Sequence, residues 1–388
     1  MSEWRTVNLG DCCEITSSKR IFYNEYVESG VPFYRSKEII EKAKGDVISN
    51  PLYISQARYD EIKGAFGIPQ KGDMLLTAVG SLGIPYLIKD SNPFYFKDGN
   101  LIWFRSFNED LNSKFLYFWF KTRNAYQMLD KIAIGSAQKA LTISSIKQIS
   151  LEIPVRETQN RIVSILSRYD SLIENYQRQI KLLEEAAQRL YKEWFVDLHF
   201  PGHETTPIID GIPEGWEKKT VGEIAEFKRG KTITKKDIIE GSIPVVAGGL
   251  EPAYYCNKSN TGQRVITVSG SGANAGFTRM YFEKVWASDC SFIDCSTTEY
   301  LHFIYCYLIA NKSFLDNLQK GAAQPHVYAK DINALVVLVP SHNVINSFES
   351  LASKIFDVIA SKNNQIRNLT EARDRLLPKL MSGEIDIV

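Results

Sequence analysis

The sequence predicts an α+β protein in which one structural unit, a globular domain followed by a long helix, occurs twice. Three observations predict this fold class. Matching motifs recur in the same order in the two halves of the 388 residues. Apolar residues recur at the 4-3 spacing of a coiled coil in two long stretches. The remaining sequence contains short β-type runs bounded by Gly, Pro, Asn and Asp.

The two copies match at an offset that changes only within the globular parts. Trp4 matches Trp216, 212 positions later, and residues 77–81 match residues 267–271 at an offset of 190. From Gly135 onward, which matches Gly321, the offset stays at 186. Loops can differ in length between copies whereas a repeated helix keeps its register, so this pattern indicates a duplication.

A segment rich in Pro and Gly, residues 199–215, separates the copies, because such residues end a helix. We therefore expect a first domain at 1–152, a first helix at 153–200, a second domain at 201–339 and a second helix at 340–388.

Each globular copy has the pattern of short strands followed by a late helix. The first copy predicts strands at 31–34, 73–78, 86–88 and 101–104, and an aromatic helix at 111–129. The second copy predicts strands at 244–246, 264–268 and 291–293, and a helix at 299–318. Because strands and helices do not alternate, a doubly wound parallel sheet is not expected.

Two long helices with an apolar seam follow the domains. The first seam is formed by Ile162, Leu166, Tyr169, Ile173, Tyr176, Ile180, Leu183, Ala187, Leu190 and Trp194. The second is formed by Phe348, Ala352, Ile355, Ile359, Lys362, Ile366, Leu369, Arg373, Leu376 and Leu380. Since a long apolar seam is unstable in water, the two helices should pack on each other as a coiled coil. We favour an antiparallel pair, with the domains at opposite ends about a pseudo-two-fold axis; a parallel pair is the alternative.

Two polar residues, Lys362 and Arg373, interrupt the second seam. Arg373 matches Ala187 of the first helix. It is either a register device, with a long side chain opposite a small one, or a surface arginine whose charged end reaches water. Pro378 should end or kink this helix near Leu377.

Glycine-rich and histidine motifs do not predict catalysis. Residues 270–276 could cradle a phosphate, but a strand-like run follows them, so a hairpin turn is favoured, as at residues 80–83. Residues 92–95 are similar to the N-P-P-Y/F motif of amino-methyltransferases but lack its second proline and a cofactor loop. Pro201 separates His199 from His203, so no helix presents them as a metal pair. We expect a non-enzyme without a cofactor or metal.

Composition limits the classes of function. The net charge is +1, which counts against a free-standing nucleic-acid binder but allows local basic loops, or partners that supply the charge. The six cysteines form no C-x-x-C pair and should be small buried residues in a reducing compartment. No apolar run approaches the roughly 18 residues of a membrane span, and no signal pattern begins the chain, so a cytoplasmic protein is expected.

Basic and polar loops recur at matching places in both copies. Arg and Lys contact phosphates or guanine, Gln pairs with adenine, and Ser and Gly allow close backbone approach. Ordinary loop chemistry remains the alternative. The candidate DNA-binding residues are Ser18, Lys19, Arg20, Tyr34, Arg35, Lys37, Ser81, Gln138 and Lys139 in the first copy and Lys228, Arg229, Lys231, Ser271, Asn274, Gln324 and His326 in the second. Residues 34–37 are expected to lie in a loop.

The sequence resembles the specificity subunit of type I restriction–modification enzymes over nearly its whole length. The resemblance is strongest in residues 216–223, in 321–324 with the matching 135–138, in 153–162, in the helix 180–195 and in the ending 376–383. Residues 341–346 depart from it, because they lack the Glu-Thr-Gln-Asn-Arg that begins the first helix.

The resemblance implies two target recognition domains, each reading half of a bipartite, asymmetric site in double-stranded DNA. The paired helices would be a spacer and a dock for two methyltransferase subunits, and motor-nuclease subunits would join the complex. The alternative function is a coiled-coil scaffold that joins protein partners without reading DNA.

Overall fold

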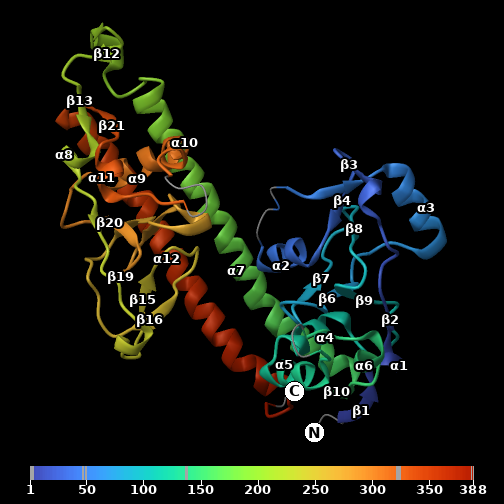
Figure 1. Cartoon of the computed structure of the whole chain (residues 1–388). Helices are drawn as coiled ribbons and strands as arrows, with labels where there is room; N and C mark the ends of the chain where they lie inside the picture. Colours follow the sequence, from blue (N-terminus) through green and yellow to red (C-terminus); the bar gives the residue numbers. More distant parts are fainter. Residues whose placement is uncertain are drawn as a thin grey trace. The chain divides into compact units, whose positions relative to one another are not determined.

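The computed structural model describes residues 4–45, 48, 50–135, 139–319, 325–385 and 387. The chain forms two compact units. Unit 1 comprises Met1–Asn175 and Ile366–Val388, and unit 2 comprises Tyr176–Gln365. Each unit contains one globular domain and a part of each long helix (Figure 1).

Unit 1 contains a two-stranded pair and two four-stranded sheets. The antiparallel pair is β1 (Trp4–Asn8) with β10 (Ser150–Pro154). One sheet has the antiparallel order β2 (Glu14–Thr16), β9 (Leu101–Arg105), β6 (Met74–Thr77) and β7 (Pro85–Leu87). The other has the order β3 (Tyr26–Val27), β5 (Leu52–Ile54), β4 (Val31–Tyr34) and β8 (Tyr95–Phe96), with β4 and β8 parallel.

The helices of unit 1 correct two predictions. They are α1 (Leu9–Cys12), α2 (Ser36–Lys44), α3 (Gln56–Phe66), α4 (Ser113–Phe120), α5 (Arg123–Ile132) and α6 (Ile143–Lys147). The helix predicted at 111–129 is two helices, because Thr122 caps α5 by accepting a 3.1 Å hydrogen bond from the Ala125 N–H. The loop predicted at 34–37 is wrong: Tyr34 ends β4, and Ser36 and Lys37 begin α2.

Unit 2 repeats this sheet topology strand for strand except for β3. Its pair is β13 (Glu217–Thr220) with β21 (Val336–Val339). One sheet has the order β14 (Lys228–Arg229), β20 (Cys290–Asp294), β17 (Val265–Ser269) and β18 (Thr278–Tyr281). The other has the order β16 (Tyr254–Cys256), β15 (Ile243–Val246) and β19 (Trp286–Ala287), with β15 and β19 parallel. A short hairpin, β11 (Ile208–Ile209) with β12 (Ile212–Pro213), precedes them. The predicted duplication is confirmed.

The helices of unit 2 are α8 (Val221–Ile224), α9 (Leu301–Ala310), α10 (Lys312–Asn317) and α11 (Ala329–Asn333). The single helix predicted at 299–318 is therefore two, α9 and α10, separated at Asn311, whose side-chain amide donates to the Tyr307 carbonyl at 2.9 Å. Short 3-10 turns occur at Tyr23–Glu25 in unit 1 and at His203–Thr205, Lys235–Asp237 and Gly272–Asn274 in unit 2.

Two long helices, α7 (Arg156–Tyr191) and α12 (His342–Met381), carry the predicted seams. A π-helical turn, Lys192–Val196, continues α7. None of the predicted seam residues is exposed. Of the two outcomes expected at Pro378, an end or a kink near Leu377, the end is wrong, because the helix continues through Pro378 to Met381 and the Ser382 N–H bonds the Pro378 carbonyl at 3.0 Å.

The two helices are antiparallel within each unit, as predicted. In unit 1, Ile162 near the start of α7 shares a core with Leu377 and Leu380 near the end of α12. In unit 2, Trp194, just after α7, lies against Phe348 near the start of α12, with 6.0 Å between ring centroids. Opposite helix ends thus meet in each unit (Figure 1).

The burial of the cysteines and the character of the helices can also be compared with the sequence. Five of the six cysteines are buried, whereas Cys295 is exposed and departs from the expectation. Within the described ranges, no helix combines the length and the apolar character that a membrane span requires.

Candidate nucleic-acid interface

The glycine-rich turns are hairpin tips, as predicted. In unit 1, residues 80–83 connect the antiparallel strands β6 and β7. Thr77 holds this tip, because its hydroxyl donates to the Ser81 carbonyl and accepts from the Ile84 N–H at 2.9 Å. In unit 2, the 3-10 turn Gly272–Asn274 connects β17 and β18.

A second loop reaches each hairpin tip. In unit 1, Val79 pairs with Ala140, and the Leu141 N–H donates to the Ala78 carbonyl at 2.9 Å. The predicted residues Ser81 and Lys139 therefore lie on segments that meet. Gln138 itself lies outside the described residues.

Unit 2 repeats this meeting of hairpin and loop. Ser271 pairs with His326, and the Gly272 N–H donates to the Pro325 carbonyl at 3.1 Å. Three predicted residues, Ser271, Asn274 and His326, are thus brought together although 55 positions separate the first from the last. Gln324 lies outside the described residues.

We term residues 18–20 of unit 1 and 228–231 of unit 2 the basic loops. The segment between β19 and β20, residues 288–289, connects this hairpin to the basic loop of unit 2, and we term it the central loop of unit 2. The Gly270 N–H donates to the Asp289 carbonyl at 3.1 Å, and the Ser271 hydroxyl donates to the Asp289 carboxylate. On its other side the Gly230 N–H bonds the Cys290 carbonyl at 2.7 Å. A Cβ at position 230 would lie 2.3 Å from the Ser288 carbonyl oxygen, so only glycine fits there.

The equivalent segment of unit 1, residues 97–100 between β8 and β9, is its central loop. Arg20 Nε donates to the Asp98 carboxylate at 2.8 Å. The Asn100 carbonyl accepts from the Ser36 hydroxyl at 3.3 Å and from the Ala78 N–H at 2.8 Å. The basic loop, the first residue of α2 and the hairpin therefore all contact the central loop of unit 1.

The sequence reasoning missed both central loops. Asp98, Asn100 and Asp289 carry no motif of their own, and their partners are distant in the sequence. The Asp-Gly-Asn turn at 98–100, directly before a predicted strand, was the available signal.

Several predicted residues of unit 1 also support the fold. Ser18 and Tyr34 are buried, and the Tyr34 ring lies 5.2 Å from that of Phe94. The Lys19 N–H donates to the Tyr95 hydroxyl at 2.7 Å, and its ammonium lies 4.0 Å from the centroid of the Phe66 ring. Ser18 Oγ has no hydrogen-bond partner among the described atoms.

Three further cations of unit 1 are paired. Lys37 lies 3.8 Å from Glu41, and Lys139 pairs with Asp130. The Arg35 guanidinium pairs with Glu38 at 2.5 Å, and the Arg35 N–H donates to the same carboxylate at 2.8 Å. Burial alone would raise the pKa of Glu38, but these hydrogen bonds outweigh it and hold that pKa below its ordinary value.

The basic residues predicted in unit 2 form fewer ion pairs than those of unit 1 among the described residues. Lys228, Arg229 and Lys231 are exposed on β14 and the following loop. The described residues provide none of them with an ion-pair partner within 4 Å. In this unit Asn274 donates weakly to the Gly248 carbonyl at 3.4 Å, and the His326 ring stacks on Tyr328 with 5.8 Å between centroids.

A cavity of about 810 Å³ lies beside the hairpin tip of unit 1. It is bounded by α2, the tip and α5, and its basic and aromatic lining includes Lys44, Lys121, Tyr126 and the predicted Ser81 and Lys139. Asp130 also lines the cavity and pairs with Lys139, and Lys121 lies 3.6 Å from Asp170, so much of this positive charge is already balanced.

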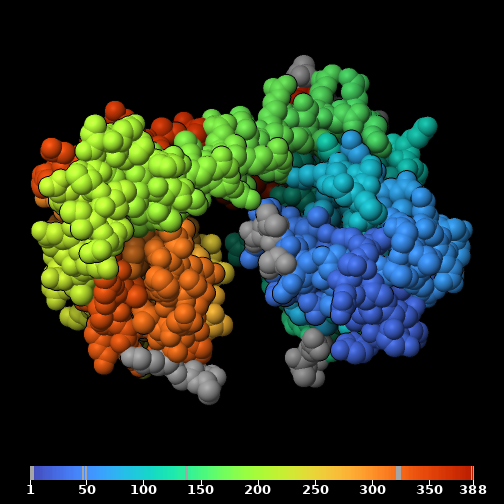
Figure 2. All heavy atoms as spheres, turned by 90° about the horizontal axis from the view of Figure 1, so that it is seen from above, coloured from blue at the N-terminus to red at the C-terminus, as the bar shows by residue number. Residues whose placement is uncertain are grey.

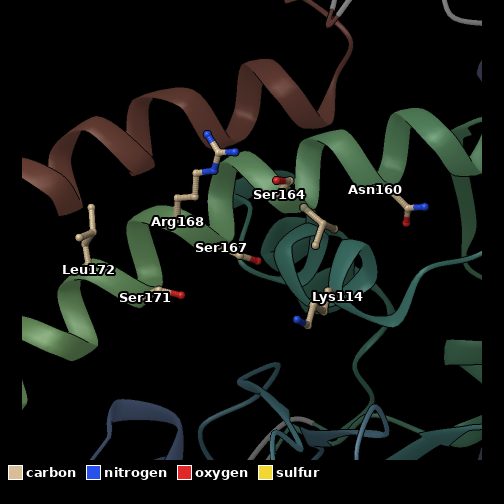
Figure 3. Close-up of a pocket in the computed structure, with 8 residues that line it drawn as sticks. Lys114, Asn160, Ser164, Ser167, Arg168, Ser171 and Leu172 are labelled. Atoms are coloured by element: carbon tan, nitrogen blue, oxygen red, sulfur yellow. The ribbon is translucent and has the colours of Figure 1, made fainter.

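An open groove of about 600 Å³ follows the first half of α7. Figure 3 shows Lys114 of α4 and a row of α7 side chains along it, including Ser164, Arg168 and Leu172. Neither Lys114 nor Arg168 has an ion-pair partner among the described residues. In the space-filling view, side chains of α7 (green) form part of the molecular surface (Figure 2).

The motifs set aside in the sequence have structural roles. Phe94 and Tyr95 of the methyltransferase-like tetrapeptide are buried in the domain. His199 Nδ1 lies 2.9 Å from Glu193, and His203 Nδ1 lies 2.9 Å from the Phe200 carbonyl. No cluster of three or more His, Cys, Asp or Glu side chains suited to a metal occurs in the described part of the chain.

Comparisons with known proteins identify the family and the fold. A family model described as the type I restriction modification DNA specificity domain matches residues 1–185 and 213–369. The specificity subunit of type I restriction enzyme MjaIX from Methanocaldococcus jannaschii is 27% identical over 416 residues, covering 99% of this chain and 94% of that protein. The HindI specificity subunit from Haemophilus influenzae is 22% identical over 472 residues, and the match covers 99% of this chain and 100% of that protein.

A solved structure shares the fold. The crystal structure of a type I restriction–modification S subunit from M. genitalium is 17% identical, with a TM-score of 0.60 and coverage of 100% of this chain and 97% of that one. The family model matches both copies and most of the sequence. The chain therefore belongs to the family of type I restriction–modification DNA specificity proteins.

Proposed function

We propose that this chain is the DNA specificity subunit of a type I restriction–modification assembly and recognises a bipartite, asymmetric site in double-stranded DNA. The observation that carries the proposal is the repeated arrangement of basic loop, central loop and hairpin tip in both domains. The backbone bond from hairpin to central loop recurs, from the Ala78 N–H to the Asn100 carbonyl and from the Gly270 N–H to the Asp289 carbonyl. The side-chain contacts differ: Asp98 accepts from Arg20 of the basic loop in unit 1, whereas Asp289 accepts from Ser271 of the hairpin in unit 2. A constant frame with different side chains suits two readers of different half-sites.

The chemistry of each interface suits a duplex. Exposed Lys and Arg side chains bind phosphates, and Ser, Asn and His side chains on a hairpin tip can reach base edges. The net charge of +1 provides little general attraction for DNA. Partner subunits would supply further phosphate contacts, and their catalytic groups would perform methylation and cleavage, so this chain directs chemistry and performs none.

The two long helices would serve as spacer and dock. We infer that two methyltransferase subunits bind along them and that motor-nuclease subunits join through the complex. The groove on α7, with Lys114, Arg168 and Leu172, supports such a dock, because it offers exposed charge and apolar surface on a helix whose opposite seam is already packed. Its proposed work on cellular DNA would place the protein in the cytoplasm.

The decisive experiment is selection from a random duplex pool by this chain in complex with its methyltransferase subunits. We expect an enriched motif in two parts with a fixed gap, and methylated adenines at that motif in the host genome. An Asp289→Ala variant of the complex should lose selection of one half only, because the carboxylate holds the Ser271 side chain at the tip. A stable complex that enriched no motif would instead support the scaffold function.

A further inference from the structure

A 3-10 turn occupies the same place in both domains but presents different chemistry. It spans Tyr23–Glu25 in unit 1 and Lys235–Asp237 in unit 2, an offset of 212 residues, as for Trp4 and Trp216. Each turn follows the predicted basic loop within a few residues. The closing bond is the same: the Glu25 N–H donates to the Phe22 carbonyl at 3.0 Å, and the Asp237 N–H to the Thr234 carbonyl at 2.9 Å.

Acidic side chains hold both turns from within. Glu25 accepts the Phe22 N–H at 2.7 Å and pairs with Arg58 at 2.8 Å. Asp237 accepts the Thr234 hydroxyl at 2.6 Å. The residues between these anchors are thus presented on a fixed backbone, which reduces the entropy that a contact would cost.

The presented side chains lie at the surface, where the Tyr23 ring meets only the edge of the Tyr26 ring among the described aromatic contacts, with 5.8 Å between centroids. Tyr23 is 89% exposed and Phe22 is 58% exposed. In unit 2 the matching turn places Lys235 where Tyr23 stands and Lys236 where Asn24 stands, while Thr234 matches Phe22. Both lysines are exposed and have no ion-pair partner among the described residues. Aromatic side chains on a rigid turn suit a contact, because they offer a large apolar area and lose little conformational entropy when bound.

We propose that this turn is a DNA-contact element whose chemistry is specific to each domain. In the first domain, Tyr23 and Phe22 pack against bases and sugars of the first half-site as an apolar wedge. In the second, Lys235 and Lys236 bind phosphates beside the second half-site. The proposal rests on the proposed function and adds contacts that the loop chemistry alone did not indicate.

The difference between the copies selects DNA over a protein partner. A partner that docked on both copies alike would meet similar residues in each, whereas Tyr23 is matched by Lys235, Asn24 by Lys236 and Phe22 by Thr234. Duplex DNA accepts both chemistries, since apolar side chains wedge at base steps and ammonium groups bind phosphates. The basic loop beside each turn, with Arg20 or Arg229, adds the matching charge.

Equilibrium binding by the complex with its methyltransferase subunits tests the first domain. Tyr23→Ala should weaken binding to the selected site roughly 5- to 150-fold, the range of one base–aromatic contact. It should leave binding to DNA with a scrambled first half unchanged, and Tyr23→Phe should restore most of the loss because the ring is retained. Unchanged thermal unfolding would exclude a structural cause, as expected for an exposed side chain.

Salt dependence tests the second domain. The double variant Lys235→Ala, Lys236→Ala should weaken binding to all sequences alike and make the slope of log K against log salt shallower by about 2, at roughly 0.9 per phosphate contact. Tyr23→Ala should leave this slope unchanged.

Three outcomes would overturn the proposal. Tyr23→Ala could bind the selected site as tightly as the parent, it could weaken selected and scrambled DNA equally, or the lysine variant could keep the parent slope. If the parent complex itself selected no bipartite sequence, the proposed function would fail and the turn's role with it. A selective parent with an unaffected Tyr23→Ala would contradict the turn alone.

Discussion

The guanidinium of Arg373 on α12 donates a 2.7 Å hydrogen bond to the Asp170 carboxylate on α7. Their side chains are only 18% and 17% exposed. Lys121 lies 3.6 Å from the same carboxylate. The polar break in the second seam is therefore filled by a charge whose partner lies on the facing helix, which favours the register interpretation over a surface arginine. The partner is an aspartate, not the small residue that the sequence suggested.

Loss of this pair should destabilise unit 1. Arg373→Ala leaves a half-buried carboxylate short of a donor, so we expect a loss of about 1.5–3 kcal/mol in the free energy of unfolding. Denaturant unfolding measures it. Arg375→Ala is the matched control, because Arg375 is 82% exposed and its contact with Glu371, at 3.7 Å, is a loose surface ion pair. This variant should change stability by no more than about 0.5 kcal/mol. Equal effects from the two variants would contradict a role for Asp170.

The architecture was predictable wherever it depends on local pattern. The strand at 31–34 occurs as predicted, because its apolar run is bounded by Gly30 and a helix start. The seams could be predicted because a helix repeats its buried face every three or four residues, so all ten positions of a seam independently indicate the same helix and the same buried face.

Tertiary contacts decided the rest. Residues 36–44 have a helical pattern too short to recognise, and α2 forms because Ile39 and Glu38 are buried, with the Arg35 N–H on the Glu38 carboxylate. The central loops escaped prediction for a similar reason. Arg20 and Asp98 are 78 positions apart, and no local sequence pattern predicts a contact between residues so distant in the chain.

Stability should depend on pH through Glu38. Its folded-state pKa is lowered, because hydrogen bonds from Arg35 outweigh burial. A lowered pKa contributes stability above the unfolded value of about 4.3, and this contribution is lost as pH falls through the folded value. Glu38→Gln should therefore destabilise most near neutral pH and progressively less below about pH 4, as urea unfolding at several pH values would reveal. Glu41→Gln, which loses only the 3.8 Å contact with Lys37, should show a small, pH-independent change. A constant deficit for Glu38→Gln would refute the linkage.

Gly230 should be intolerant of any side chain. A Cβ there would lie 2.3 Å from the Ser288 carbonyl oxygen, so Gly230→Ala must push the basic loop away from the central loop of unit 2. We expect a loss of about 1–3 kcal/mol in unfolding free energy, together with weaker binding of the second half-site and an unchanged first half-site. Gly64→Ala is the control, because its Cβ meets nothing within 4 Å on helix α3 and should stabilise by up to about 1 kcal/mol. A neutral Gly230→Ala would mean that the two loops are not held together.

The spacer role predicts the effect of lengthening both helices together. Helices α7 and α12 each continue without interruption through residues 175–176 and 365–366, where the units divide. Seven residues inserted at both points keep the 4-3 seam and add roughly 10 Å at 1.5 Å per residue. The gap between half-sites should grow by about three base pairs at 3.4 Å each, with both half-sites unchanged.

The control for this change inserts five residues at both points, because five residues break the seam register and should abolish a stable complex. Mapping the methylated sites of a host that carries the lengthened chain measures the gap directly. An altered half-site with the original gap would mean that the helices do not set the spacing, since added length would then have acted on the domains and not on the distance between the sequences they read.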